Sequence, residues 1–598
     1  MWYGLVIVFA GAIAYANSFR GVFLLDDFGH IVTSETIKSV GPLSVHLADF
    51  RPLVHFTLAL NYAISGLEVW SYHVVNLLIH LASAMVLYTI LKSTPKLSSR
   101  EGGSFQDRSQ PLLSTQIAFA VALLWAIHPI QTQAITYIIQ RGESLMGMWY
   151  LFVIYCVLRC HLSGNWAAWK IIAVACCAAG MFTKETMVTA PFAALMYDAV
   201  FLSGTWRGAL RRRWPMYVGM SLTWGILAYL GLFHDILYGS KKHGVDLGFQ
   251  VETMTPWTYL LTQPEVILHY LRLCVWPYPQ CFDYGWQPVK SWMDAAVPGM
   301  IVLAMLGVTA LGLIKRPKLG FLGAWVFVIL SPTSSFIPIK DFAFEHRMYL
   351  PLATILILAV AGGQRIVEAT GKRIGVVLFT LAAVLLGGRT ILRNADYSSA
   401  SVMWADVVAQ RPMHARAWNY YGVALAVEGK HEDAVRAYQQ ALAIKPDSDD
   451  VQINCGKALS KLGRYPEAVT HYREALKVSA DDAMLHHSLA IALEKCGQLD
   501  AALAEYSETI RLDPGHPFAR FNRGLALKSA GKWAEAEVAF EQAAKFNTGD
   551  ADARYQRAVC LVQLGKVQGA VQELEWVVQG RPDHAAAREL LAQLRRPG

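Results

Sequence analysis

The pattern of apolar and polar positions divides the chain into two parts. Long apolar runs, among them residues 2–17, 74–91 and 376–386, dominate the first two-thirds. Beyond about Asp396 the sequence becomes polar and rich in Ala, Glu and Lys. Runs of about 20 apolar residues are long enough to cross a bilayer as helices. We therefore predict an all-α protein, in which a multispan helical membrane domain is followed by a second helical domain.

The apolar runs predict about eleven membrane spans. They lie near residues 2–18, 73–92, 113–129, 144–161, 168–184, 187–203, 215–233, 297–314, 319–337, 348–364 and 374–391. A further apolar stretch at 257–276 is interrupted by Pro264 and carries Arg272. We interpret this stretch as a re-entrant or interfacial helix.

Basic residues set the predicted orientation. They cluster in the alternate loops 92–108, 207–213, 315–318 and 365–373. Short loops rich in Lys and Arg face the cytoplasm, so the N-terminus is predicted to lie inside. The first loop, residues 19–72, and everything after about Leu392 are then outside. The net charge of +8 needs no nucleic acid partner, because much of it lies in these loops.

From Ala415 the chain repeats every 34 residues. Trp418, Gly422 and Tyr438 begin a pattern of small and aromatic positions that recurs through five units, as in tetratricopeptide (TPR) repeats. Such repeats stack into an α-solenoid. The predicted domains are a membrane domain at 1–394, a linker and half-repeat at 395–414, five repeats at 415–584, and a capping helix and tail at 585–598.

The sixth position of each repeat is predicted to face the concave groove of the solenoid. It is occupied by Tyr420, Asn454, Ser488, Asn522 and Gln556. Amide side chains there could bond the backbone of an extended peptide, whatever its side chains. The alternative is a solvated inner face that tolerates polar residues of any kind.

Ionisable residues gather in the predicted outer loops and at outer span ends. Asp26 and Asp27 follow the first span, and several cations lie at the ends of later spans. Charged groups at the membrane rim are costly and are usually functional when they converge. A carboxylate can act as a base toward a hydroxyl, while fixed cations stabilise a departing phosphate. The mixture therefore indicates transfer of a group from a phosphate carrier.

These motifs occur in an order that resembles a known family. The segments are Phe23–Asp27, Arg51-Pro52-Leu53, His73 with Asn76 and His80, His128-Pro129, Arg141-Gly142-Glu143, Lys184-Glu185 and Glu345–Pro351. Together with the repeats they resemble the GT-C glycosyltransferases, in particular the transmembrane-and-TPR-containing protein O-mannosyltransferases and their bacterial relatives. The family's late motif usually has Arg directly after Glu, whereas here His346 stands between Glu345 and Arg347.

The resemblance implies roles for individual residues. Asp26 or Asp27 would be the catalytic base or a metal ligand, which leaves a divalent metal open. Binding of the donor phosphate is expected from Arg347, Lys184, Arg141 and His346. Positioning of the substrate is expected from Arg51, His55, Glu143 and Glu345.

The implied function is a membrane hexosyltransferase. It would move mannose or another hexose from a polyprenyl-phosphate carrier to Ser or Thr of an extracytoplasmic protein held by the repeats. The chain has no Asn-x-Ser/Thr sequon, which favours a bacterial inner membrane with periplasmic repeats over an endoplasmic reticulum membrane with lumenal repeats. Two alternatives are a non-catalytic membrane-anchored scaffold for envelope assembly, and the same enzyme type acting on a lipid or polysaccharide.

Individual motifs also have structural explanations. The pair Asp26-Asp27 could cap a short helix. Lys184-Glu185 could be an ion pair at a span end, and Arg347 could pair with Glu345. The histidines could be hydrogen-bonded packing residues rather than metal ligands.

Overall fold

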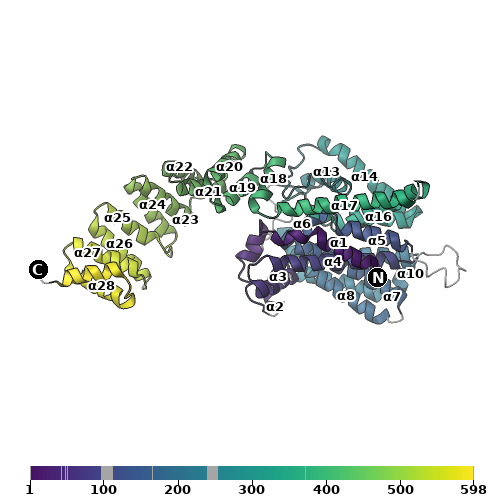
Figure 1. Ribbon diagram of the computed structural model, residues 1–598, viewed down its shortest axis with the longest axis horizontal. Coiled ribbons are helices and arrows are strands. Elements are labelled where there is room, and N and C mark those ends of the chain that lie inside the picture. Colours follow the sequence, from purple (N-terminus) through teal and green to yellow (C-terminus); the bar gives the residue numbers. More distant parts are fainter. Residues whose placement is uncertain are drawn as a thin grey trace. The chain divides into compact units, whose positions relative to one another are not determined.

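The computed structural model is helical throughout the part of the chain that it describes (Figure 1). The described residues are 2–41, 43–47, 49, 51–95, 112–163, 166–238, 254–370, 372–547 and 549–596. Within these ranges there is no β-strand, so the predicted all-α class is confirmed. Part of the predicted basic loop 92–108 lies outside the described residues. The chain forms two compact units, Met1–Arg411 and Pro412–Gly598.

The first unit contains the apolar helices. In its first half these are α1 (Trp2–Ala14), α2 (Leu43–His46), α3 (Pro52–Ser65), α4 (Trp70–Ser93), α5 (Thr115–Ala126), α6 (Thr132–Ile135), α7 (Arg141–Leu162), α8 (Trp166–Met181) and α9 (Ala190–Tyr197). The second half comprises α10 (Trp206–Leu222), α11 (Trp224–Tyr229), α12 (Leu232–Tyr238), α13 (Pro256–Val275), α14 (Trp292–Lys315), α15 (Pro317–Leu330), α16 (Leu352–Thr370), α17 (Lys372–Asp396) and α18 (Ala400–Gln410). Short 3-10 or π turns connect several of them, including η1 (Ala16–Arg20), η2 (Phe28–Val32), η3 (Pro129–Gln131), η4 (Ile138–Gln140), η5 (Glu185–Thr189), η6 (Asp198–Leu202) and η7 (Glu345–Met348).

Five helical segments of the described chain are long and apolar enough to cross a membrane. They are Trp2–Arg20, Trp70–Ser93, Ile138–Leu162, Trp292–Lys315 and Arg373–Asp396. A bent pair, Thr115–Ala126 with Pro129–Ile135, makes a sixth if it counts as one span, and shorter apolar helices lie at Trp166–Met181, Pro317–Leu330 and Leu352–Arg365. The stretch expected to be re-entrant is α13, which is not among the candidates. The count of about eleven spans therefore stays a prediction.

Two of the expected spans are divided into shorter helices. The segment predicted at 187–203 consists of η5, α9 and the π turn η6. The next one, predicted at 215–233, begins inside α10, which is kinked at Arg213 just before Pro215. Proline removes a backbone donor and clashes with the preceding turn. Arg213 turns inward there and donates to Asp198 at 2.6 Å, so it holds a buried ion pair and does more than mark topology.

The second unit is a series of antiparallel helix pairs. Its helices are α19 (Ala415–Val427), α20 (His431–Ile444), α21 (Asp449–Lys461), α22 (Tyr465–Leu476), α23 (Ala483–Lys495), α24 (Leu499–Leu512), α25 (Ala519–Ser529), α26 (Trp533–Phe546), α27 (Ala551–Gln563), α28 (Val567–Gly580) and α29 (Ala585–Arg595). Ten of them form five pairs that match the five predicted repeats, and α29 follows the last pair. The limits of the predicted domains at 394, 414 and 584 stay predictions.

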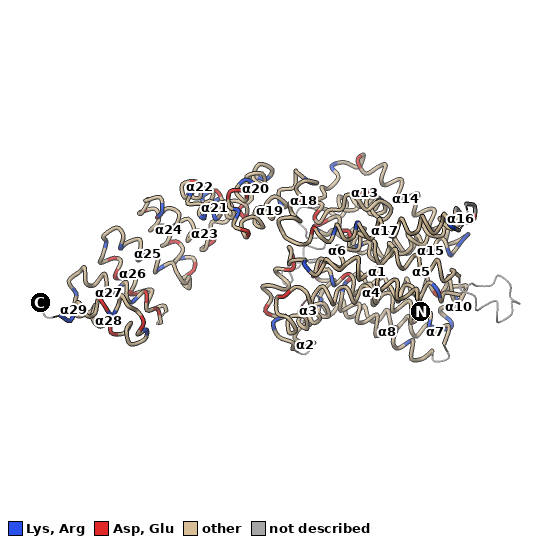
Figure 2. Tube along the Cα trace, viewed as in Figure 1, with Lys and Arg blue, Asp and Glu red and all other residues tan. Residues whose placement is uncertain are grey.

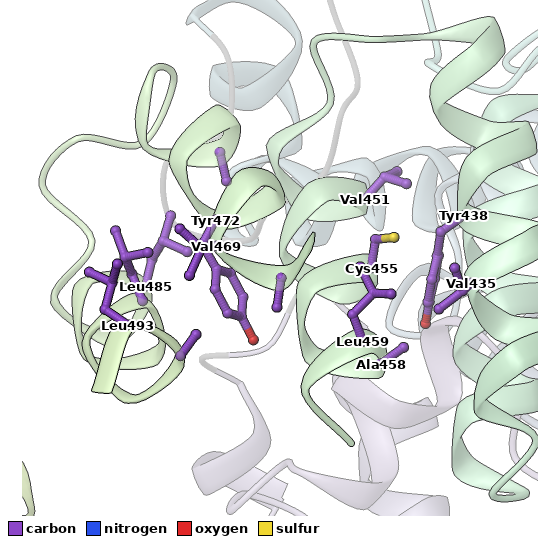
Figure 3. Packing of buried hydrophobic residues seen from close by; sticks show 14 of the residues in the cluster. Val435, Tyr438, Val451, Cys455, Ala458, Leu459, Val469, Tyr472, Leu485 and Leu493 are labelled. Atoms are coloured by element: carbon purple, nitrogen blue, oxygen red, sulfur yellow. The ribbon is translucent and has the colours of Figure 1, made fainter. Parts of the chain in front are cut away.

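Small and aromatic residues bring the two helices of each repeat together. Tyr438 lies beside Val435 and Tyr472 beside Val469, and both rings are buried in one apolar cluster (Figure 3). A Cβ atom on the glycine one helix earlier would approach these rings closely; on Gly456 it would lie 2.6 Å from Cε1 of Tyr472. Real Cβ contacts are not that short, so each aromatic ring occupies space that only glycine leaves open.

We expect Gly456→Ala to destabilise the second repeat by about 1–3 kcal/mol, because the methyl group overpacks the interface with Tyr472. Hydrogen exchange of α21 and α22 in the full-length, detergent-solubilised chain measures this locally. Gly549→Ala is the matched control, since its Cβ would meet only Oδ1 of Asn547 at 3.7 Å. Equal protection of α21 in both variants would contradict the packing argument.

Candidate functional site

The two acids of the first outer loop have different surroundings. Asp27 is buried, and its carboxylate accepts hydrogen bonds from the backbone N–H of Leu24 at 2.9 Å and of Ile139 at 2.8 Å. Asp26 is exposed, and its backbone N–H donates to the hydroxyl of Tyr137 at 2.9 Å. Asp27 therefore joins the first outer loop to η4, whereas the side chain of Asp26 is accessible to a substrate.

The backbone turns sharply between these acids and the first span. Leu25, directly before Asp26, has a φ of 40°. A bulky non-glycine residue rarely adopts a positive φ, and such strain persists only where neighbouring contacts enforce it. The hydrogen bonds on both sides, from Leu24 to Asp27 and from Asp26 to Tyr137, enforce it here. The strained turn directs Asp26 outward while Asp27 points into the protein.

Burial, with a smaller contribution from the charge of Asp26, raises the pKa of Asp27 to about 8, although the two backbone N–H groups and Arg141 act to lower it. An aspartate that is protonated near neutral pH is a poor base at that pH. Of the two acids, Asp26 is therefore the better placed for proton transfer, a distinction that the sequence left open.

Two ion pairs connect segments that are far apart in the sequence. Arg51, just before α3, donates to both carboxylate oxygens of Glu185 at 3.2 Å. Lys184 lies 2.8 Å from Glu143 in the first turn of α7, and both side chains are almost completely buried. The explanation of Lys184-Glu185 as a local ion pair is therefore wrong, since each residue pairs with a different distant partner.

Burial alone would raise the pKa of Glu185, but the charges of Arg51 and Lys184 hold it below its ordinary value. The carboxylate therefore stays ionised. Glu185 was not among the predicted site residues, although its place beside Lys184 in an outer loop is the signal that could have indicated it.

His346 lies among the cations. Burial lowers its pKa well below the ordinary value, and the nearby charges of Lys184, Arg347 and Arg51 lower it further. Its backbone N–H and its Nδ1 both lie close to Oε1 of Gln133, at 3.0 and 3.1 Å. Because that oxygen accepts, Nδ1 carries the proton, and the neutral ring presents Nε2 as an acceptor.

Three other predicted site residues bind backbone or amide groups. Arg141 donates to Oδ1 of Asn76 at 2.6 Å and to the carbonyls of Thr57 and Tyr72 at 3.0 Å. Arg347 and Glu345 also form several hydrogen bonds within the protein, Arg347 as a donor and Glu345 as an acceptor. Arg347 donates to the carbonyls of Phe342, Asp341 and Thr333, and Glu345 accepts from Gln280, Cys281 and Tyr284. These contacts fix the loops around the site.

The segment with Glu345–Met348 is held tightly against α7. A Cβ atom on Gly147 would lie 2.5 Å from Cε1 of Tyr349, so only glycine allows this approach. Trp125 also donates to the carbonyl of Tyr349 at 2.9 Å. The late motif is therefore positioned by close packing with α5 and α7 as well as by hydrogen bonds.

His55 belongs to a second polar group in the same outer loop. Nδ1 of His55 lies 3.2 Å from the carboxylate of Asp49, which also lies 3.9 Å from Nδ1 of His46. The rings of His55 and His30 are in edge-on contact, with their centroids 5.5 Å apart. Burial lowers the pKa of His30, His55 and Arg51 lower it further, and Asp26 opposes them. The charges of Asp26 and Arg51 therefore act in opposite directions on the same imidazole.

The part of the chain that the structure describes contains no group of three or more His, Cys, Asp or Glu side chains arranged to hold a metal ion. The divalent metal that the resemblance leaves open stays a prediction.

The predicted groove residues of the repeats mostly bind neighbouring side chains. Asn454 donates to Asn419 at 3.1 Å, and Nδ2 of Asn522 lies 2.9 Å from Nε2 of His487. Gln556 accepts from Lys528 at 2.6 Å, and Ser488 donates to the carbonyl of Met484 in its own helix. Tyr420 is half-buried. The contacts of Asn454, Asn522 and Gln556 each connect adjacent repeats, so part of the ladder stabilises the solenoid itself.

Comparison with known families supports both halves of this description. Residues 109–228 match the family described as dolichyl-phosphate-mannose-protein mannosyltransferase. Residues 425–490 and 527–594, and also 385–449, match tetratricopeptide repeats. The predicted repeat architecture is confirmed.

Curated relatives combine the same two parts. The protein O-mannosyl-transferase Tmtc3 of Drosophila melanogaster is 24% identical over 76% of this chain and 56% of the relative's length. The protein O-mannosyl-transferase TMTC1 of Homo sapiens is 24% identical over 74% of this chain and 55% of the relative's length. TMTC4 of Mus musculus is 23% identical over 73% of this chain and 66% of its own. The chain resembles the transmembrane-and-TPR protein O-mannosyltransferases. The resemblance stated from the sequence is thereby confirmed, although the chain spans only about half to two-thirds of these relatives' length.

A solved structure, YrrB, described as a TPR protein with an unusual peptide-binding site, is 22% identical. The match covers 32% of this chain and 98% of the YrrB chain, with a TM-score of 0.30.

The family matches and the apolar helices together identify a membrane protein with a mannosyltransferase-like segment and helical repeats.

The raised pKa of Asp27 predicts a pH-dependent stability. An unfolded aspartate titrates near a pKa of ~3.9, whereas Asp27 in the folded chain titrates at about 8. The contribution of Asp27 to stability is therefore complete below the pKa of the unfolded chain, ~3.9, and is lost as the pH rises through the pKa of the folded chain, about 8.

We expect the unfolding temperature of the solubilised chain to fall as the pH rises between these two pKa values. Asp27→Asn should make this fall smaller. Glu35→Gln, a change at an exposed acid of the same loop, should leave the slope unchanged. The same slope in Asp27→Asn and the wild type would exclude Asp27 as its source.

Proposed function

We propose that this protein is a membrane glycosyltransferase that moves a hexose from a polyprenyl-phosphate carrier to a Ser or Thr hydroxyl of a protein. The mannosyltransferase match at residues 109–228 supports the reaction class, and mannose is the sugar its description favours. The repeats support a protein acceptor. The reaction takes place on the extracytoplasmic side, in a bacterial inner membrane with periplasmic repeats or in an endoplasmic reticulum membrane with lumenal repeats.

The observation that carries the proposal is the environment of Lys184. This ammonium is 6% exposed and has three N–H donors. Among the described residues its one charged partner is Glu143. A buried cation is costly unless its donors are satisfied. The remaining donors suit the phosphate oxygens of a donor substrate, with Arg51 close enough to add charge.

Each bond change can be assigned to a group. Asp26 takes the proton of the acceptor hydroxyl, and the oxygen attacks the anomeric carbon. The bond between that carbon and the carrier phosphate breaks, and the phosphate leaves as an anion that Lys184 and Arg51 stabilise. Nε2 of the neutral His346 is a hydrogen-bond acceptor, so it suits a sugar hydroxyl, which can donate, better than a phosphate oxygen, which cannot.

In this proposal the remaining predicted residues position the reacting groups. Arg141, Arg347, Glu345 and Asp27 hold loops through backbone hydrogen bonds. Glu143 and Glu185 fix the two cations. His55, through its ring contact with His30, supports the side of the loop that carries Asp26.

Replacing the base tests the reaction. We expect Asp26→Asn to lower the rate of sugar transfer by about 10²–10⁴-fold, because proton transfer by a positioned base contributes that much. Membrane insertion and affinity for the donor should not change. Glu35→Gln is the control at an exposed carboxylate of the same loop. Transfer assayed by mass spectrometry of Ser or Thr hexosylation gives the result, and wild-type activity in Asp26→Asn would remove the catalytic assignment.

Phosphate binding can be separated from folding. Lys184→Met leaves Glu143 buried without its partner, which costs about 3–5 kcal/mol of stability. In Lys184→Met/Glu143→Gln the unpaired charge is gone, so stability should recover while donor binding stays weakened. If the double variant recovers both, Lys184 has a structural role only. If neither variant transfers a sugar to protein and no polyprenyl-phosphate sugar binds the wild type, the scaffold alternative is favoured.

A further inference from the structure

Two adjoining cavities lie at the end of the membrane unit opposite to the candidate site. The first, of about 250 Å³, lies between the last turn of α4, α7, α15 and α16. Leu87, Leu91, Ile154, Phe321 and Trp325 are among its lining residues. Its walls are therefore almost entirely apolar.

The polar groups in these walls bond within the protein. Trp325 donates to the carbonyl of Leu350 at 3.1 Å, Thr354 donates to the carbonyl of Pro351, and Thr94 donates to its own helix and contacts Tyr197. The cavity consequently offers no unsatisfied side-chain group of these residues to a polar ligand. A hydrocarbon chain suits such a surface, since burying each CH₂ contributes about 0.8 kcal/mol.

The second cavity, of about 680 Å³, shares Lys318 and Leu319 with the first. It adds Arg316 and the start of α10 at Thr205 and Trp206. No acidic residue lines it. Neither Arg316 nor Lys318 forms an ion pair with a carboxylate in the described part of the chain. The apolar cavity therefore opens beside a cationic one.

The position of these cations is fixed by a tight hairpin. A Cβ atom on Gly320 would collide with the backbone of Gly312 and Leu313, so α14 and α15 approach closely there. The N–H of Arg316 donates to the carbonyl of Gly312 at 2.7 Å, and Pro317 begins α15. The cationic connection is thus short and preorganised.

Both cavities are far from the candidate site. Along α4, Leu91 in the apolar cavity comes 19 positions after Tyr72, whose carbonyl accepts a hydrogen bond from Arg141. At about 1.5 Å per residue this is about 28 Å, close to the thickness of a bilayer core. Figure 2 shows Lys and Arg where α15, α16 and α10 lie, at this end of the unit. By the positive-inside rule this end faces the cytoplasm.

We propose that the two cavities form a binding site for one anionic glycerophospholipid of the cytoplasmic leaflet. An acyl chain occupies the apolar cavity, and the headgroup phosphate lies between Arg316 and Lys318. Basic pockets between membrane helices on this side are suited to anionic headgroups. The donor's sugar phosphate is used about 28 Å away, across the core, so this site is distinct from it. The inference does not depend on the proposed reaction.

Native mass spectrometry of the full-length chain tests this inference, with dioleoyl-phosphatidylglycerol, dioleoyl-phosphatidylcholine and undecaprenyl phosphate as the added lipids. We expect one retained phosphatidylglycerol per chain. Arg316→Gln/Lys318→Gln should weaken its retention about 30-fold, because each such cation contributes a factor of about five in affinity. Arg211→Gln/Arg212→Gln, which removes two exposed cations on the same side and outside both cavities, should retain it fully.

A second variant addresses the acyl chain. Leu358 lines the apolar cavity and is 47% exposed, so Leu358→Trp narrows the cavity with little risk to folding. It should lower phosphatidylglycerol retention while both cations remain. Equal retention of phosphatidylcholine, equal loss in the two double variants, preferential retention of undecaprenyl phosphate, or full retention in Leu358→Trp would each overturn the proposal.

Discussion

The arrangement of the site depends on the two hydrogen bonds that the buried carboxyl group of Asp27 accepts from backbone N–H groups. This carboxyl group joins the loop after the first span to the turn before α7, two segments that a membrane bundle could otherwise position independently. Buried polar groups must be satisfied inside the protein, since lipid offers no partners. Asp27 accepts hydrogen bonds from both Leu24 and Ile139 and so holds the strained backbone of Leu25 between them. As a result the side chain of the preceding residue, Asp26, points outward.

The same principle explains the charged residues around Asp27. Arg141 connects α3, α4 and α7 through carbonyls and one amide, and Arg347 and Glu345 hold the loops on either side of η7. Each replaces missing solvent with several hydrogen bonds, which is the condition for keeping a charge buried. Lys184 keeps unused N–H donors, and Asp26 has an exposed carboxylate. These two residues are therefore the best suited to bind a substrate. Structural and chemical roles are divided among residues of the same types.

Much of the architecture could be predicted from the sequence. The 34-residue period locates five helix pairs because Gly456 and Tyr472, and their equivalents, occupy complementary space at fixed spacing. The apolar runs identify the long helices such as α4 and α14. The order of short motifs indicates the family. Span limits were less predictable where Pro215 and the pair of Asp198 with Arg213 interrupt an apolar run, because hydropathy does not register a buried ion pair that satisfies itself.

The sequence by itself determined the all-α class, the repeats, the membrane character and the set of ionisable residues, since periodicity and hydropathy are local properties of the chain. Only the tertiary structure decided which of these residues bind one another. Asp26 and Asp27 are adjacent and chemically identical, yet one is exposed and the other is bonded to a segment more than a hundred residues away. Likewise Lys184 pairs with Glu143 rather than with its neighbour Glu185. Partners and burial follow from the packing of distant helices, and these two quantities set whether a charge holds the fold or remains available for chemistry.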